Sequence, residues 1–266
     1  QYAGTLALSE QRLAMVLAAV EAGYWDWNLV TGEVTFSPRF GPIFTNLVCR
    51  LLLEHKTAKV QSALLEAMQE FEVTYGGQTY PLDRPFFILA TQNPIEQAGT
   101  YPLPEAQLDR FLLFVKIGYP TEQEEYGILS STTGSKTQKV EPVLSGEEIR
   151  QIQSLVRDVS ISDDLINYVG KLIRTSRPDT TTSDYVKEWV RWGAGPRAGQ
   201  ALILTAKARA LLKGRYAVIM EDLHSMAYPV LRHRILVNFK AEAENVNTDL
   251  VTAELIRTIE RPKISV

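Results

Sequence analysis

Cysteine is almost absent from this chain. Cys49 is the only cysteine among 266 residues, so no disulfide can form within the chain, and a reducing cytoplasm is the expected compartment. No apolar run approaches the roughly 20 residues that a membrane-spanning helix needs. The formal net charge of -3 lacks the basic excess that is typical of proteins that bind nucleic acid. We therefore expect no membrane span and no nucleic-acid partner.

Histidine is equally scarce, and a phosphate-binding loop is missing. The three histidines are not spaced as metal ligands, so no metal site is predicted. None of the 16 glycines begins the pattern G-x-x-x-x-G-K-[ST], whose backbone N–H groups and lysine hold the phosphates of a nucleotide. The Gly170-Lys171 pair lies in a helix-like stretch without the first glycine of that pattern. These residues therefore lack the phosphate-binding loop, which is one essential element of nucleotide hydrolysis.

What the chain does contain is a long motif at 85–111, PFFILATQNPIEQAGTYPLPEAQLDRF. The apolar run Phe86–Ala90 predicts a strand buried on both faces of a parallel sheet. The run leads into Asn93 at the carboxyl edge, which is where open α/β sheets bind ligands. A short helix is predicted to begin near Pro104, because proline suits the first helical turn, and to carry Arg110.

This motif resembles the MoxR family of AAA+ ATPases, in which LATQNP followed by GTYPLPEAQLDRF is a long and specific signature. The similarity continues over most of 41–259. The resemblance implies an α/β fold, in which a partial AAA+ nucleotide-binding core of parallel sheet and helices is followed by an α-helical lid. It also implies ATP and Mg²⁺ as cofactors, and ATP hydrolysis in a hexameric ring that does chaperone-like remodelling. Partners with von Willebrand factor A domains are common in that family.

The resemblance assigns roles to three residues. Asn93 matches sensor 1, which contacts the γ-phosphate or orients the attacking water. Arg110 matches the arginine finger, which reaches the nucleotide of a neighbouring subunit. Arg197, in GAGPRAGQ, matches sensor 2, which stabilises the γ-phosphate from the lid, although the family usually has serine where Gly195 stands. Arginine suits both roles because its guanidinium is permanently charged and forked.

The same residues also have simpler interpretations. Asn93 could cap the turn before Pro94, and Arg110 could form a surface ion pair with Glu105 or Asp109. The surrounding signature favours the functional interpretation of both.

The acidic pair of the family's Walker B strand is replaced in this chain. In register, Leu51 and Leu52 stand where the family has an Asp that helps to hold Mg²⁺ and a Glu that polarises water. Leucine cannot coordinate a hard cation, which needs oxygen ligands, and it cannot accept a proton. Glu54 is either a substitute base or an exposed charge at the end of a strand. These replacements predict that ATP hydrolysis by the chain alone is impaired.

The first 40 residues carry a second resemblance. Apolar residues at helical spacing within 13–20 are followed by YWDWNLV and EVTFS, which flank Thr31-Gly32 and predict a hairpin. This piece, 11–40, resembles the opening helix and first hairpin of a PAS sensor domain. The alternative is an edge hairpin packed on the next domain.

The remaining pattern is strand-rich and then helix-rich. A hairpin is predicted within 71–82 around Gly76-Gly77, a buried strand at 112–117, and a polar linker at 130–142. Helices are expected near 121–130, 145–156, 162–176, 197–213, 220–236 and 249–259. The predicted domains are a PAS-like piece at 1–40, a partial AAA+ core at 41–130 and a helical lid at 131–266.

Three functions remain open at this point. The first is a MoxR-type ATPase that binds and hydrolyses ATP by ancestry and is impaired in hydrolysis. The second is a non-catalytic ring subunit or assembly module that supplies Arg110 in trans. The third and weakest is a PAS-type signalling protein.

Overall fold

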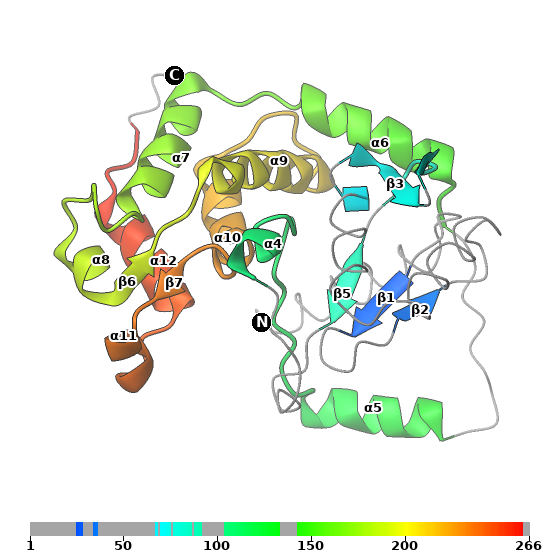
Figure 1. Ribbon diagram of the computed structural model, residues 1–266, viewed down its shortest axis with the longest axis horizontal. Coiled ribbons are helices and arrows are strands. Elements are labelled where there is room, and N and C mark those ends of the chain that lie inside the picture. Colours follow the sequence, from blue (N-terminus) through cyan, green and yellow to red (C-terminus); the bar gives the residue numbers. More distant parts are fainter. Residues whose placement is uncertain are drawn as a thin grey trace. The chain divides into compact units, whose positions relative to one another are not determined.

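The structure is a computed structural model, and it divides into two compact units (Figure 1). Unit 1 takes its residues from 1–102 and 117–152, and unit 2 takes its residues from 103–116 and 153–266. The described residues are 67–68, 70–75, 77–86, 88–91, 104–133 and 143–262, with the backbone of 25–28 and 34–36. The predictions for Asn93, Leu51, Leu52, Glu54 and the helix within 13–20 lie outside them. The domain boundaries expected at 40 and 130 stay a prediction.

Unit 1 contains a small mixed sheet, a separate hairpin and a helix. Its elements are β1 (Trp25–Asn28), β2 (Val34–Phe36), β3 (Glu72–Tyr75), β4 (Gln78–Pro81), β5 (Leu89–Thr91), α5 (Glu122–Thr132) and the start of α6 (Gly146–Asp158). Strand β1 lies between β2 and β5, antiparallel to the first and parallel to the second. The hairpin expected around Thr31-Gly32 is confirmed by β1 and β2, and it extends the sheet that contains the LAT strand of the long motif.

Strand β5 is shorter and more exposed than the apolar run predicted. It covers Leu89–Thr91, whereas the prediction began at Phe86, and Leu89 is 42% exposed. The reason is its position: in the part of the chain that the structure describes, β5 is at the edge of its sheet and pairs only with β1. The prediction of a strand buried on both faces is therefore wrong here, and a wider parallel sheet covered by helices stays a prediction.

The hairpin of β3 and β4 confirms the turn predicted within 71–82. Tyr75 pairs with Gln78 at the end of the antiparallel ladder, which leaves a two-residue turn. Gly77 has a φ of +80° in that turn, a left-handed conformation that glycine adopts without a steric penalty. Val73, in the first strand of the hairpin, is buried.

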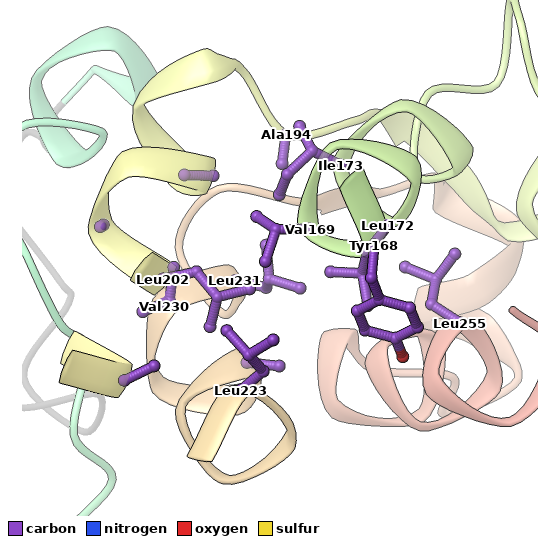
Figure 2. Packing of buried hydrophobic residues seen from close by; sticks show 14 of the residues in the cluster. Tyr168, Val169, Leu172, Ile173, Ala194, Leu202, Leu223, Val230, Leu231 and Leu255 are labelled. Atoms are coloured by element: carbon purple, nitrogen blue, oxygen red, sulfur yellow. The ribbon is translucent and has the colours of Figure 1, made fainter. Parts of the chain in front are cut away.

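Unit 2 is built mainly from helices around one apolar core. Its elements are α4 (Glu105–Leu108), α7 (Asp163–Thr175), α8 (Asp184–Trp189), β6 (Val190–Trp192), α9 (Pro196–Leu212), α10 (Met220–Leu231), β7 (Leu236–Val237), α11 (Phe239–Ala243) and α12 (Thr248–Thr258), with the end of α6. Helix α9 packs against α7 and α10, and α12 packs against α7 and α10. Figure 2 shows the buried side chains between these helices, among them Val169, Leu172, Leu202, Leu231 and Leu255. Removing this apolar surface from water is the main force that holds the unit together.

Several helices of unit 2 begin where the sequence provides a capping side chain. The N-cap side chain accepts a hydrogen bond from a backbone N–H of the first turn in α7, α8, α11 and α12, with Ser162, Ser183, Asn238 and Asn247 as the caps. The helices expected near 145–156, 162–176, 197–213 and 249–259 are confirmed to within about two residues, and the caps of α7 and α12 help to fix where those two helices begin.

The part of the chain that was predicted to be helix-rich also contains two short strands. The helix predicted over 220–236 ends at Leu231, and Leu236–Val237 forms β7, which pairs antiparallel with β6. The backbone turns because the N–H groups of Arg234 and Ile235 both bond to the carbonyl of Leu231. The side chains of 232–234 are then directed at another segment of the chain.

That other segment is 111–116, and it corrects a second prediction. The apolar run 112–117 was expected to form a buried strand, but it has no regular secondary structure, and Ile117 is 82% exposed. Its backbone pairs with the end of α10 rather than with a strand: the N–H of Phe114 donates to the carbonyl of Pro229 at 2.7 Å. An extended apolar segment can satisfy its backbone in this way without entering a sheet.

No helix in the described part of the chain combines the length and the hydropathy that crossing a membrane requires.

Candidate functional site

Arg234, just after α10, is a buried arginine whose side chain is 3% exposed. Its guanidinium donates five hydrogen bonds. Nε contacts Oδ1 of Asp109 at 2.9 Å, Nη1 contacts the carbonyls of Val230 at 2.7 Å and Leu112 at 3.2 Å, and Nη2 contacts the carbonyls of Asp109 at 3.0 Å and Phe111 at 2.6 Å. An arginine side chain has five N–H donors, so each has an acceptor.

These bonds offset the cost of burying the charge, and they also hold the chain around Arg110. Burying a charged group is expensive unless it is paired and hydrogen-bonded. Asp109 and Phe111 are the residues on either side of Arg110, which is itself half-buried. We call Arg234 with the backbone of 109–112 the arginine clamp. The clamp fixes the backbone on both sides of the predicted arginine finger.

The electrostatics of the clamp also involve Arg197. Burial lowers the pKa of Arg234, the hydrogen bond and charge of Asp109 raise it, and the positive charge of Arg197 lowers it again. Arg197 therefore lies close enough to the clamp for its charge to act there. Arg234 stays protonated at neutral pH because its ordinary pKa is far above 7.

His233 lies against the same segment. It is 7% exposed, its Nε2 donates to the carbonyl of Phe111 at 2.9 Å, and its ring stacks on Phe114 with 6.1 Å between centroids. Burial, and then the charge of Arg234, lower the pKa of His233 to about 4. The imidazole is therefore neutral at pH 7. A carbonyl acceptor requires the proton on Nε2, and the buried Nδ1 has no hydrogen-bond partner.

Lowering the pH is expected to destabilise the folded state through His233. Its pKa is about 4 when folded and near 6.5 when unfolded, so the unfolded chain binds the proton more tightly. The stability from the neutral ring is complete above pH 6.5 and is lost as the pH falls from 6.5 through 4. This shift corresponds to about 3 kcal/mol in the free energy of unfolding. Urea unfolding of the wild type and of His233→Gln between pH 7 and pH 4 measures it.

Glutamine is the matched replacement because its amide can donate to the Phe111 carbonyl and does not titrate. The carboxylates titrate equally in both proteins, so the difference between the two unfolding free energies isolates His233. Parallel curves across this pH range would contradict the assignment.

Arg197 is exposed in the first turn of α9, and the loop before it is fixed to the end of α7. A Cβ on Gly193 would lie 2.4 Å from the carbonyl oxygen of Ser176 and 2.6 Å from Cα of Arg177, so only glycine fits this close approach. Oγ of Ser176 accepts the N–H of Ala194 at 3.0 Å, and Nε of Arg177 donates to the carbonyl of Ala194 at 3.0 Å. The tertiary structure thus determines where α9 begins and where Arg197 stands.

The start of α9 can accept an anionic group. Its N-cap, Gly195, makes no side-chain capping bond, and Pro196 follows at the first helical position. The first-turn N–H groups carry a partial positive charge, to which Arg197 adds a full one. By contrast, in the part of the chain that the structure describes, no group of three or more His, Cys, Asp or Glu side chains could hold a metal ion. The first turn of α9 therefore has the charge that suits the phosphates of a nucleotide.

Two parts of the chain match known protein families, and several known proteins are similar to most of its length. Residues 22–113 match the ATPase family associated with various cellular activities (AAA), and 183–255 match the AAA lid domain. The chain is 37% identical over 235 residues to the chaperone MoxR1 of Mycobacterium tuberculosis, covering 88% of this chain and 62% of MoxR1. It is 37% identical over 237 residues to the uncharacterized protein YeaC of Bacillus subtilis, covering 89% and 71%. The chain belongs to the MoxR-type family of AAA ATPases.

A solved structure agrees with that membership. A crystal structure of a candidate ATPase from Cytophaga hutchinsonii is 35% identical, with a TM-score of 0.74, and the match covers 91% of this chain and 73% of that one. The fold is accordingly an AAA ATPase domain with a helical lid. The chain spans less than two thirds of the length of MoxR1.

Membership in the MoxR-type family corrects the interpretation of the first 40 residues. The AAA match begins at residue 22, not at Gly41, and it includes β1 and β2. These strands pair with each other, and β1 also pairs with β5 of the long motif. The resemblance to a PAS domain is therefore not supported: two short strands with aromatic and turn residues are too common a pattern to identify a domain.

The structure also places the predicted site residues of this MoxR-type chain. Arg110 and Arg197 both lie in unit 2, and the clamp holds the backbone on both sides of Arg110, whereas Asn93 lies outside the described residues. Sequence reasoning missed Arg234. A signal was present in VLRHRIL, where three basic residues interrupt an apolar helical stretch. A buried arginine needs acceptors, and four of the five bonds of Arg234 go to 109–112.

Proposed function

We propose that this chain is a subunit of a MoxR-type ring ATPase and supplies Arg110 to ATP held by a neighbouring subunit. The observation that carries the proposal is the arginine clamp, which fixes the backbone on both sides of Arg110. An arginine that stabilises a transferring phosphoryl group must be held in place before the reaction, because reorganising it during the reaction would cost rate. A rigid support for Arg110 is what that task requires.

The neighbouring subunit has to supply the parts that this chain lacks. The 266 residues contain no G-x-x-x-x-G-K-[ST] loop, and Leu51 and Leu52 stand in place of the Walker B acids. We assign no residue of this chain to Mg²⁺. When bound, ATP supplies the phosphoryl group that is transferred to water. This chain contributes a positive charge from Arg110, and its own hydrolysis of ATP is impaired.

The wider role follows from the family. MoxR1 is called a chaperone, and we propose chaperone-like remodelling in an oligomeric, family-type hexameric ring in the cytoplasm. Proteins with von Willebrand factor A domains are the proposed partners. Asn93 keeps its proposed role as sensor 1.

The test is ATP hydrolysis by a mixture. This chain is added to a complete MoxR-type ATPase whose own arginine finger is alanine, and Mg²⁺-dependent phosphate release is measured. The rate is expected to rise with the amount of added chain. An unchanged rate at every ratio would contradict the proposal.

The second candidate function is an ATPase that still binds nucleotide itself. The start of α9 favours it, since an exposed Arg197 stands in the first turn of a helix whose N-cap, Gly195, makes no side-chain capping bond. Titration of the chain with a fluorescent ATP analogue, with and without Mg²⁺, is expected to show saturable binding that Arg197→Ala weakens. Losing one charge-assisted contact of this kind costs about 1.5–3 kcal/mol, or roughly a tenfold to hundredfold rise in Kd.

Arg257→Ala is the control for that titration, because Arg257 is an exposed arginine of α12 that pairs with Glu254 in its own helix. It should bind the analogue as the wild type does. No binding by the wild type at millimolar analogue would exclude this second function for the chain alone and leave the first.

A further inference from the structure

We infer that Arg234 is a positioning residue for Arg110, and that it joins the arginine finger to the lid. This inference rests on the proposed function of Arg110. The supporting side chain comes from a distant part of the chain, since Arg234 lies 125 positions further along than Asp109.

The distribution of the five bonds is the first step of the argument. One bond stays within the end of α10, to the carbonyl of Val230. The other four go to 109–112: the carboxylate and the carbonyl of Asp109, and the carbonyls of Phe111 and Leu112. A planar guanidinium bound at all its donors cannot rotate without breaking several bonds together. The peptide groups on both sides of Arg110 are therefore fixed to one rigid plane.

The second step is the place of Arg234 in the lid. Its own backbone is bonded to the last turn of α10, and α10 packs against α9, which begins with Arg197. The segment that follows α4 is bonded to the end of α10 through the Phe114 N–H, which donates to the carbonyl of Pro229. The charge of Arg197 also acts on Arg234. The arginine directed to a neighbour's nucleotide and the arginine at the start of α9 are thus supported by the same pair of packed helices.

The third step separates positioning from general stability. The hydrophobic core of unit 2 lies between α7, α9, α10 and α12, and Arg234 is not part of it. His233 and the Phe114 N–H add further bonds to the same segment, but both attach it beyond Arg110. The side chain of Arg234 bonds to both residues that flank Arg110, Asp109 and Phe111. Loss of the clamp should therefore loosen 109–112 while the core remains folded.

The test uses Arg234→Lys, which keeps the positive charge but lacks the forked N–H donors of the guanidinium. Hydrogen exchange is measured at the amides of Phe111 and Phe114, which bond to the carbonyls of Leu108 and Pro229. We expect exchange at these amides to rise at least ~10-fold, which corresponds to the loss of one or more charge-assisted bonds. Amides of the core helix α7 should exchange as in the wild type. The matched control is Arg257→Lys, an exposed arginine paired within α12.

The second readout is the ATP hydrolysis assay with the complete MoxR-type ATPase whose own arginine finger is alanine. Arg234→Lys should lower the maximal rate of ATP hydrolysis, measured at a saturating concentration of this chain, at least ~10-fold. The concentration of chain that gives half of the maximal effect should stay within ~2-fold of the wild-type value. The reason is that the interface is intact and only Arg110 is misplaced. If Arg234→Lys fails to fold, Asp109→Asn serves instead: it removes one charged acceptor and leaves the carbonyls, so both effects should be smaller and in the same direction.

The outcomes of these experiments distinguish the positioning role of Arg234 from the proposed function of Arg110. Unchanged exchange at Phe111 and Phe114, or an unchanged maximal rate, would overturn the role of Arg234 while the proposed function stands. A wild-type chain that gives no stimulation would overturn the proposed function, and the positioning role would fall with it. Faster local exchange together with a lower maximal rate supports the inference.

Discussion

Replacing Arg110 with alanine is expected to abolish the stimulation that this chain gives to a MoxR-type ATPase without its own arginine finger. The guanidinium neutralises charge on the transferring phosphoryl group, and arginine fingers contribute about 10³ to 10⁵ in turnover. Even a ring in which only some positions hold this chain should therefore show a large loss. The measurement is the initial rate of phosphate release at saturating Mg²⁺ and ATP.

Two further variants make this result specific. Arg110→Lys keeps the charge but lacks the forked donor, so it should restore only part of the rate. Arg257→Ala removes an exposed arginine elsewhere in unit 2 and should stimulate as the wild type does. Equal stimulation by the wild type and Arg110→Ala would show that Arg110 is an ordinary surface charge, the simpler interpretation of its sequence position.

Replacing Asp222 with alanine is expected to cost about 3–5 kcal/mol of the free energy of unfolding, the range found when one partner of a buried ion pair is removed. Asp222 is 0% exposed in α10. Its carboxylate accepts Nη1 of Arg209 at 2.6 Å, two nitrogens of Arg215 at 2.7 Å each, and the N–H of Ile219 at 3.0 Å. Truncation leaves these donors without their shared acceptor. Urea unfolding at pH 7 measures the loss.

The pKa of Asp222 gives the pH range in which this network acts. Burial raises the pKa of the carboxyl, but hydrogen bonds from Arg215, the Ile219 N–H and Arg209 outweigh it, and the pKa lies below its usual value of 3.8. A depressed pKa means that the stabilisation is complete above the unfolded value and is lost as the pH falls through the folded one. At pH 7 the full effect of the substitution should be visible.

Glu221 is the matched control for Asp222. It is the adjacent residue, it also contacts Arg209, at 3.1 Å, and its side chain is 70% exposed. Glu221→Ala should cost less than about 1 kcal/mol, because exposed ion pairs contribute little. Similar losses for both variants would mean that burial does not decide the strength of this network.

The amino-acid sequence by itself determined the family and much of the local structure. The 85–111 motif was sufficient to identify the MoxR family, and the spacing of apolar residues located α6, α7, α9 and α12. Local rules suffice for such features because capping side chains, helical periodicity and a two-residue glycine turn act within a few residues. The same local pattern was misleading where it was short, as in the hairpin assigned to a PAS domain.

Only the tertiary structure decided how the proposed site is held. The run at 112–117 looks like a strand, but its partners are Pro229, Arg232 and Arg234, more than 100 positions away. Gly193 is required by the backbone of Ser176 and Arg177, which no local rule indicates. In the sequence Arg234 is one of several charged residues, and its five acceptors are brought around it only by the tertiary structure. Contacts between distant segments depend on the packing of whole helices. A sequence pattern that extends over a few residues therefore cannot predict them.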